Sequence, residues 1–293
     1  MTPSERTAGL PRHVGVLGGG RMGAGIAHAF LMAECTVLVV ERNSGAADAA
    51  RERIAESVAK SVERQLARGD ANRSPSAILE RLAVSTSYAE FVQCELVVEA
   101  VPEIQELKMA ALRDVEDHVG PDAFLASNTS SLSVSALAAA LVRPESFLGL
   151  HFFNPVPASA LVEVVAGEKT APSLVTTARD WVAALGKTAV VVNDSPGFAS
   201  SRLGVMLALE AMRMLEAGVA SAEDIDAAMV LGYRHHTGPL RTTDLVGLDV
   251  RLEIADYLAR TLGERFAPPQ ILRDKVARGE LGRKSGRGFF DWN

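Results

Sequence analysis

The sequence predicts a doubly wound α/β sheet that is followed by an all-helical C-terminal domain. Up to about residue 190, short apolar runs alternate with longer segments of helical periodicity, as in βαβ units. The short runs are apolar without alternation, which is typical of parallel strands covered on both faces. Beyond a turn cluster at 194–197 the pattern is mostly helical. We therefore expect two domains, residues 1–193 and 194–293, which suits a chain of 293 residues at about 150 residues per domain.

Each expected strand is a short apolar run, and each expected helix carries apolar residues at helical spacing. The expected strands are 13–17, 36–40, 96–98, 123–126, 147–150, 161–165 and 189–192. The expected helices of the first domain are an Ala-rich segment ending near Ala33, residues 46–68 and residues 106–119. Those of the second domain are 200–217, a helix starting at the capping-box-like Ser221-x-x-Asp224, 250–262 and 269–278.

The composition excludes several classes of protein. There are 36 acidic and 30 basic residues, a formal net charge of −6, whereas a nucleic-acid binder needs a basic face. No apolar stretch approaches the ~18 residues of a membrane span, and residues 1–12 lack the apolar core of a signal peptide. Cys35 and Cys94 are too few for a disulfide framework and fit a reducing compartment, so we expect a cytoplasmic protein. The six histidines form no HExxH or Cys/His cluster, and no metal site is predicted.

A glycine-rich loop follows the first expected strand and opens the first expected helix. Its pattern is Gly18-x-Gly20-x-x-Gly23, in which the first glycine permits a tight turn and the second admits a pyrophosphate to the backbone. The third glycine lets the helix pack on the strand, and the helix N-terminus then faces the phosphates. Glu41 ends the second strand, where a carboxylate can accept hydrogen bonds from the ribose hydroxyls of NAD, although the neighbouring Arg42 keeps NADP open. The sequence therefore predicts a Rossmann-type NAD-binding domain, and the alternative is a glycine-rich turn beside a solvated Glu.

Two further groups of polar residues follow apolar strands of the first domain. The run Ser127-Asn128-Thr129-Ser130-Ser131 lies where ligands bind in open α/β sheets, unless it only caps a helix that starts near Val134. Glu163 interrupts an aliphatic strand, and a buried carboxylate needs a partner. Its spacing from His151 allows the two segments to be neighbouring strands with the side chains in contact. Such a pair is a general base held in one tautomer by an acceptor, although a lone His is more often a satisfied core residue.

At this point the sequence resembles the NAD-dependent (S)-3-hydroxyacyl-CoA dehydrogenases, including the bacterial 3-hydroxybutyryl-CoA type. The resemblance extends from about His13 to Asp291. The motifs that carry it are Gly18-Gly19-Gly20-Arg21-Met22-Gly23, Val97-Val98-Glu99-Ala100, Ala126-Ser127-Asn128-Thr129-Ser130-Ser131, His151-Phe152-Phe153-Asn154-Pro155, Leu161-Val162-Glu163-Val164, Pro196-Gly197-Phe198, Thr237-Gly238-Pro239-Leu240 and Leu281-Gly282-Arg283-Lys284-Ser285-Gly286.

The resemblance implies roles for individual residues. His151 would take the hydroxyl proton from substrate C3, Glu163 would orient the imidazole, and Ser130 would hydrogen-bond the reacting oxygen near the nicotinamide. The positions that match NAD contacts, besides the glycine loop with Met22, are Glu103, Lys108, Asn154 and Lys284. Ser57 and Arg64 match positions that contact CoA. The family forms its dimer through the C-terminal domain, so a homodimer is expected.

Four departures from the family concern the substrate side. Ser201 stands where an Asn usually holds the thioester or keto oxygen, and Ser has a shorter reach. Residues 157–160 replace the usual Met-Lys, and His236 and Thr237 stand where Pro and Met are common. The helix that would face CoA has Arg64 but few lysines. The acyl chain and its carrier are therefore less defined than the redox chemistry.

Three hypotheses about function follow. The first is an NAD-dependent oxidation of a short-chain (S)-3-hydroxyacyl-CoA to the 3-oxoacyl-CoA, and the reverse. The second keeps this chemistry but places the acyl group on an acyl carrier protein, or uses a free hydroxy acid. The third is a protein that binds NAD without catalysis.

Overall fold

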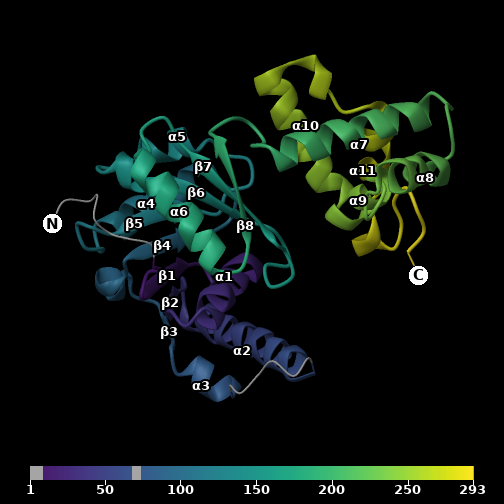
Figure 1. The fold of residues 1–293 in the computed structure, drawn as a ribbon. Coiled ribbons are helices and arrows are strands. Elements are labelled where there is room, and N and C mark those ends of the chain that lie inside the picture. Colours follow the sequence, from purple (N-terminus) through teal and green to yellow (C-terminus); the bar gives the residue numbers. More distant parts are fainter. Residues whose placement is uncertain (1–8, 68–73, 293) are drawn as a thin grey trace. The chain divides into compact units, whose positions relative to one another are not determined.

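A computed structural model describes residues 9–67 and 74–292 of the chain. It divides into two compact units, one up to Ser195 and the other from Pro196, two residues beyond the boundary expected at residue 193. We call them the sheet unit and the helical unit, and Figure 1 labels their elements.

The sheet unit contains one eight-stranded sheet in the order β3-β2-β1-β4-β5-β6-β7-β8. The strands are β1 (His13–Leu17), β2 (Thr36–Val40), β3 (Leu82–Ser85), β4 (Leu96–Glu99), β5 (Phe124–Ser127), β6 (Phe147–Phe152), β7 (Leu161–Ala166) and β8 (Thr188–Asn193). All neighbouring strands are parallel except β6 and β7. The connection 153–160 is too short for the crossover that a parallel return requires, so β7 runs antiparallel to β6. The predicted doubly wound sheet is confirmed, with this one antiparallel pair.

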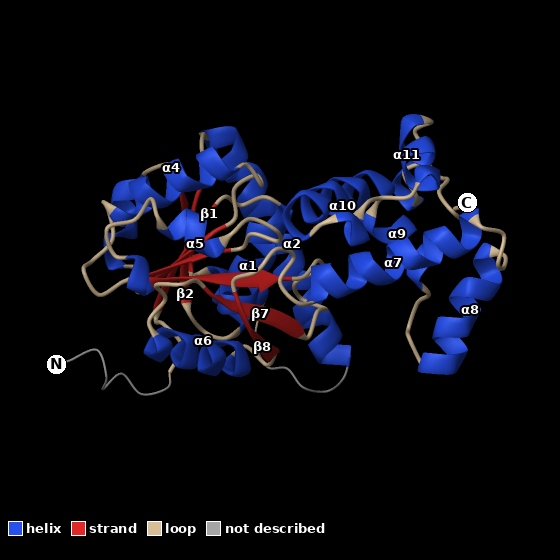
Figure 2. Cartoon of the chain, turned by 90° about the horizontal axis from the view of Figure 1, so that it is seen from above, coloured by secondary structure: helices blue, strands red, loops and turns tan. Residues whose placement is uncertain are grey.

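Helices cover both faces of the sheet. They are α1 (Arg21–Met32), α2 (Ser44–Ala67), α3 (Pro75–Leu79), α4 (Gln105–Glu116), α5 (Val134–Ala138) and α6 (Pro172–Ala184), with the 3-10 turns η2 (Tyr88–Gln93) and η3 (Pro144–Ser146). Figure 2 shows α4 and α6 on opposite sides of the strands. One continuous core joins the β-strands to α1, α2 and α6, with Phe30, Ile54 and Trp181 among its buried residues. In the sheet unit, the apolar pattern did not indicate β3 at the sheet edge, α3 or α6. In the helical unit, it did not indicate the helix at Pro239–Val246.

The helical unit has its own core. Its helices are α7 (Ser200–Glu216), α8 (Ala222–Tyr233), α9 (Pro239–Val246), α10 (Leu248–Leu262) and α11 (Gln270–Ala277), with η4 (Glu264–Phe266) and η5 (Arg283–Ser285). Ser221 Oγ accepts a hydrogen bond from Asp224 N at 3.1 Å, which confirms the predicted cap of α8. The buried Asp244 accepts hydrogen bonds from Phe289 N and Phe290 N, and so fixes the C-terminal segment on α9. In the part of the chain that the structure describes, no helix is both long and apolar enough to cross a membrane.

Candidate active site

The three glycines of the glycine loop differ in what a side chain at each position would meet. Gly18 adopts φ +89°, which L side chains rarely reach, and its N–H donates to Val40 O at 2.8 Å. A Cβ at Gly23 would clash with the carbonyl oxygen of Gly18, so the helix packs here only without a side chain. A Cβ at Gly20 would meet no described atom within 4 Å, and Gly20 supplies no side-chain cap to α1. The uncapped N-terminus of α1 beside this open space fits a pyrophosphate.

Glu41 lies directly beyond β2 and is bound to the glycine loop. Its Oε1 accepts a hydrogen bond from Gly19 N at 2.6 Å, and Arg53 Nη1 donates to Gly19 O at 2.7 Å. The carboxylate therefore sits beside the backbone that would cradle the phosphates, where the ribose next to a pyrophosphate would lie. Met22, in the first turn of α1, is partly buried and packs against the core of the sheet unit.

His151 and Glu163 form a buried pair at the end of β6. They are direct partners in the antiparallel register of β6 and β7, with Nδ1 and Oε2 separated by 2.8 Å. His151 is 6% exposed and Glu163 is fully buried, so the predicted contact is present. With the carboxylate ionised, the proton of the neutral ring lies on Nδ1, and this N–H donates a hydrogen bond to Glu163 Oε2. The ring then has its basic lone pair on Nε2.

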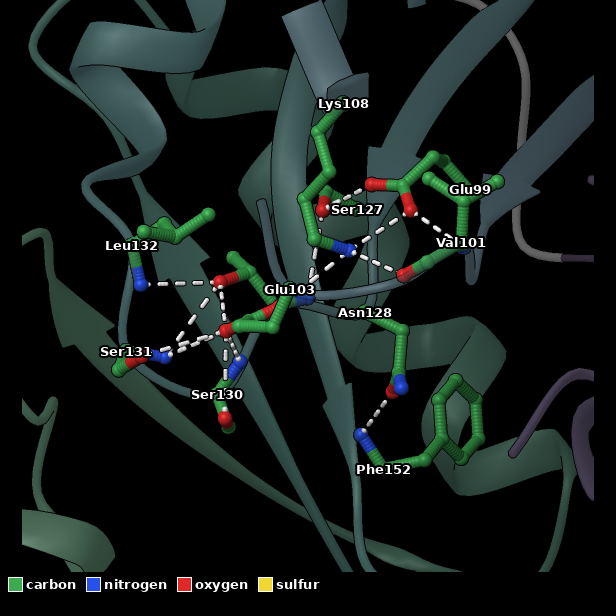
Figure 3. A network of polar contacts seen from close by, with 11 residues as sticks. Glu99, Val101, Glu103, Lys108, Ser127, Asn128, Ser130, Ser131, Leu132 and Phe152 are labelled. Atoms are coloured by element: carbon green, nitrogen blue, oxygen red, sulfur yellow. Dashed lines mark hydrogen bonds and ion pairs between the residues drawn. The ribbon is translucent and has the colours of Figure 1, made fainter. Parts of the chain in front are cut away.

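One carboxylate oxygen organises the serine segment, as Figure 3 shows. Glu103 Oε1 accepts hydrogen bonds from Thr129 Oγ1 at 2.6 Å, Ser130 N at 2.8 Å and Ser131 N at 3.1 Å. Although burial alone would raise its pKa, the nearby Lys108 and these hydrogen bonds hold the pKa of Glu103 below its usual value. Glu103 thus stays ionised and keeps Ser130 in place. The helix near Val134 is capped by Ser133, which lies outside the predicted polar run.

Beneath this segment lies a second network, built around the buried side chains of Lys108, Glu99 and Ser127, that the sequence analysis missed. Lys108 is 1% exposed, and its Nζ contacts Glu99 Oε1 at 2.7 Å, Val101 O at 3.0 Å and Glu103 Oε2 at 3.3 Å. Ser127 Oγ donates to the other oxygen of Glu99 at 2.6 Å. The sequence did contain a signal for this network, because Glu99 ends an aliphatic strand just as Glu163 interrupts one, and a buried carboxylate needs a partner. The ammonium of Lys108 is thus already engaged by protein groups, which favours an action on the cofactor site through Glu103.

Asn128 connects the serine segment to the histidine strand. Its Oδ1 accepts a hydrogen bond from Phe152 N at 2.8 Å, which ties the end of β5 to the end of β6. The carboxyl ends of the parallel strands β1, β4, β5 and β6 share one edge of the sheet. This edge therefore gathers the glycine loop, Glu103, Ser130 and His151, as the general rule for ligand sites in open α/β sheets requires.

The remaining predicted site residues lie elsewhere. Asn154 is exposed just beyond β6, while Ser57 is half-buried and Arg64 exposed on α2, one above the other along the helix. Ser201 and Lys284 belong to the helical unit, at the start of α7 and in η5. There Lys284 Nζ contacts both carboxylate oxygens of Asp249 at 2.6 Å. Among the described residues, no group of three His, Cys, Asp or Glu side chains could hold a metal ion.

The fold and this edge of the sheet define a Rossmann-type dehydrogenase with NAD as its cofactor. Comparison with known proteins places the chain more closely. Residues 13–195 match the family described as "3-hydroxyacyl-CoA dehydrogenase, NAD binding domain", and residues 197–292 match "3-hydroxyacyl-CoA dehydrogenase, C-terminal domain". The chain belongs to the 3-hydroxyacyl-CoA dehydrogenase family of oxidoreductases.

Individual relatives match this chain over nearly their whole length. The chain is 39% identical over 279 residues to a probable 3-hydroxybutyryl-CoA dehydrogenase of Deinococcus radiodurans, covering 95% of this chain and 99% of the relative. It is 40% identical over 285 residues to the 3-hydroxybutyryl-CoA dehydrogenase of Mycobacterium tuberculosis, covering 96% and 98%. The crystal structure of (S)-3-hydroxybutyryl-CoA dehydrogenase from Ralstonia eutropha superposes with a TM-score of 0.91 at 36% identity, covering 97% and 99%.

Proposed function

We propose that this chain oxidises short-chain (S)-3-hydroxyacyl-CoA thioesters such as 3-hydroxybutyryl-CoA, and catalyses the reverse reduction, with His151 as the general base. The observation that carries the proposal is the His151–Glu163 pair at 2.8 Å, on the same sheet edge as the glycine loop. The names of the relatives support the substrate class.

The proposed reaction divides the work between cofactor and side chains. NAD, when bound at the glycine loop, would supply the hydride acceptor for substrate C3. His151 takes the hydroxyl proton on Nε2, so that the C3–O bond becomes a carbonyl as the C–H bond breaks. Glu163 holds the ring and stabilises the imidazolium that forms. The Ser130 hydroxyl, which donates to Glu103 Oε1 at 3.2 Å in this structure, would turn to donate a hydrogen bond to the reacting oxygen. A positioned general base contributes about 10²–10⁴-fold to such a step.

We assign the remaining roles on the same basis. The backbone at Gly18, Gly20 and Gly23 would bind the pyrophosphate, and Glu41 the ribose hydroxyls. Glu103 fixes the serine segment against the nicotinamide half, and Lys108 acts through Glu103. The side chains proposed for the outer contacts are Met22, Asn154 and Lys284 for NAD, Ser57 and Arg64 for CoA, and Ser201 for the thioester or keto oxygen.

A second candidate keeps the chemistry and changes the carrier of the acyl group. Ser201 at the position of the family's Asn favours an acyl-carrier-protein thioester or a free hydroxy acid, because the shorter side chain alters the hold on the thioester.

Assembly and location are proposals of the same kind. We expect a homodimer through the helical unit, which exposes the large apolar side chains Val219, Leu231 and Tyr233, with Leu231 80% exposed. We expect the cytoplasm as the compartment, since Cys35 and Cys94 are both buried free thiols. Sedimentation of the purified chain at micromolar concentration checks the assembly, and a monomer would contradict it.

The deciding experiment follows NADH consumption with acetoacetyl-CoA beside acetoacetyl-pantetheine and an acetoacetyl carrier protein. We expect fast turnover of the CoA ester. His151→Ala should lower kcat at least ~10²-fold with NADH affinity nearly intact. His118→Ala, at an exposed position just beyond α4, should change kcat less than twofold. Turnover on the carrier protein alone would favour the second candidate, and loss of NADH binding in His151→Ala would remove His151 from the catalytic role. Turnover of none of the three would make Ser201 and the altered CoA helix the signs of a different substrate, such as a free hydroxy acid.

A further inference from the structure

The helical unit contains a buried arginine for which the described residues supply no charged partner. Arg251, in the first turn of α10, is 8% exposed. Within residues 9–67 and 74–292, no carboxylate pairs with its guanidinium, and its buried Nε has no hydrogen-bond partner. Burial lowers the pKa of Arg251 to about 10, which remains far above neutrality, so the group is charged. Charged groups are almost never buried in this way unless something pairs with them.

Arg251 lines a pocket of about 300 Å³ formed entirely within the helical unit. The leucines at 203 and 207 come from α7, Thr242 comes from α9, and His235 and Thr237 come from the connection before α9. No Asp or Glu is among the residues that line it. The volume is at the lower end for small-molecule sites, so a short chain with one polar end would fill it.

The lining of the pocket combines apolar and polar groups. Leu203 and Leu207 offer apolar contact to methylene groups, whereas the guanidinium and the threonine hydroxyls offer hydrogen bonds. Gly204 lies between the leucines, and a Cβ there would stand 3.6 Å from Arg251 Nη1, so the guanidinium approaches the backbone of α7 with no side chain between them. A carboxylate, like a phosphate, presents two oxygens that match a guanidinium fork, and of the two it is the smaller group for a pocket of about 300 Å³.

The pocket also adjoins the place where this chain departs from the family it resembles. Ser201 precedes Gly204 by three residues on α7, so the two positions share one face of the helix. Thr237, another of these departures, lines the pocket itself, and His236 is its neighbour in the chain. The altered oxygen-binding residue and the unpaired cation thus lie along one side of the helical unit.

We propose that this pocket binds the distal carboxylate of a short acyl chain, with Arg251 as the residue that selects it. The substrate class is then a 3-hydroxyacyl thioester that carries a second carboxylate at the far end of the acyl group. This inference rests on the proposed function, because it assumes that the acyl group belongs to a thioester bound near Ser201.

The test compares charged with uncharged acyl groups of equal length. The charged probes are the CoA thioesters of 3-oxohexanedioate and 3-oxooctanedioate, and the uncharged ones are 3-oxohexanoyl-CoA and 3-oxooctanoyl-CoA, each followed by NADH consumption. At one of the two lengths, we expect kcat/KM to favour the carboxylated ester at least 10-fold. Arg251→Leu should reduce that ratio to 1 or below, and Arg251→Lys should retain part of it because the charge stays while the fork is lost. Arg260→Leu, an exposed position on the same helix, is the matched control and should keep the full ratio.

A binding measurement separates this inference from the proposed function. Glutarate at millimolar concentration should raise the Tm of the wild type and of Arg260→Leu, and leave that of Arg251→Leu unchanged. If acetoacetyl-CoA and all four esters fail to react while glutarate acts in this way, the carboxylate site stands and the proposed function falls. A ratio near 1 in the wild type with good turnover of the uncharged esters would overturn the inference alone. The inference would also be overturned if Arg251→Leu changed the oligomeric state and kept the substrate preference. In that case a partner subunit would be what neutralises the arginine.

Discussion

The acid stability of the sheet unit should depend on His28. This side chain lies between α1 and α2, is 4% exposed, and its Nε2 is 2.9 Å from Ser61 Oγ, while Nδ1 is buried without a described partner. Burial first and the nearby Lys187 second lower its pKa from 6.5 to about 4. The folded chain therefore holds His28 neutral at a pH where the unfolded chain already protonates it.

The sign and size of the effect follow from proton linkage. Between pH 6.5 and 4 the unfolded state binds the proton and the folded state does not, so the free energy of unfolding falls as the pH falls. The difference of about 2.5 pKa units, at about 1.4 kcal/mol per unit, amounts to about 3 kcal/mol. Above pH 6.5 the contribution is constant, and below pH 4 no more is lost. A loss of this size is a large fraction of the 5–15 kcal/mol typical of a whole protein.

Urea denaturation of the wild type and of His28→Gln at pH 4, 5, 6 and 7 checks the reasoning. Glutamine keeps a hydrogen-bonding group near Ser61 but does not titrate, so the two stabilities should converge, or cross, as the pH falls through this window, by about 3 kcal/mol in total. A difference between the two proteins that is constant from pH 7 to pH 4 would refute the argument, as would an NMR titration that places the pKa of His28 near 6.5.

The other predictions concern the site. Glu163→Gln replaces a charge-assisted hydrogen bond worth about 1.5–3 kcal/mol by a weaker one. The kcat should therefore fall about 10- to 100-fold, with the KM for NADH unchanged. A change in KM alone would contradict the positioning role of Glu163. Lys108→Met leaves Glu99 buried without its counter-charge and should destabilise the sheet unit by about 3–5 kcal/mol in urea denaturation. The double variant Glu99→Gln/Lys108→Met should recover part of this loss. Equal stabilities of the wild type and the two variants would contradict the buried ion pair. Glu41→Ala should lower the ratio of kcat/KM for NADH over NADPH at least ~10-fold, and an unchanged ratio would remove Glu41 from the ribose site.

The sequence by itself determined those features that depend on neighbours along the chain. The glycine loop was evident because the tight turn, the uncapped helix start and the close packing at Gly23 all lie within one strand-loop-helix segment. The contact of His151 with Glu163 was predictable for a related reason. A short connection forces two strands to lie side by side, and the alternation of side chains then decides which residues face each other.

Only the tertiary structure decided which segments, far apart in the sequence, bind to the same carboxylate oxygen or to the same cationic side chain. Glu103 holds Ser130 across 27 positions, and Glu99 receives Ser127 across 28, because β4 and β5 are neighbours whose carboxyl ends meet at one edge. Local periodicity shows that a residue is buried, but not which group shares its burial. Arg251 is the clearest case, since an arginine near the start of a helix indicates a solvated surface until the packing of α7, α9 and α10 encloses it. The free energy of a buried charge depends on partners brought together by the fold, and those partners lie far apart in the sequence.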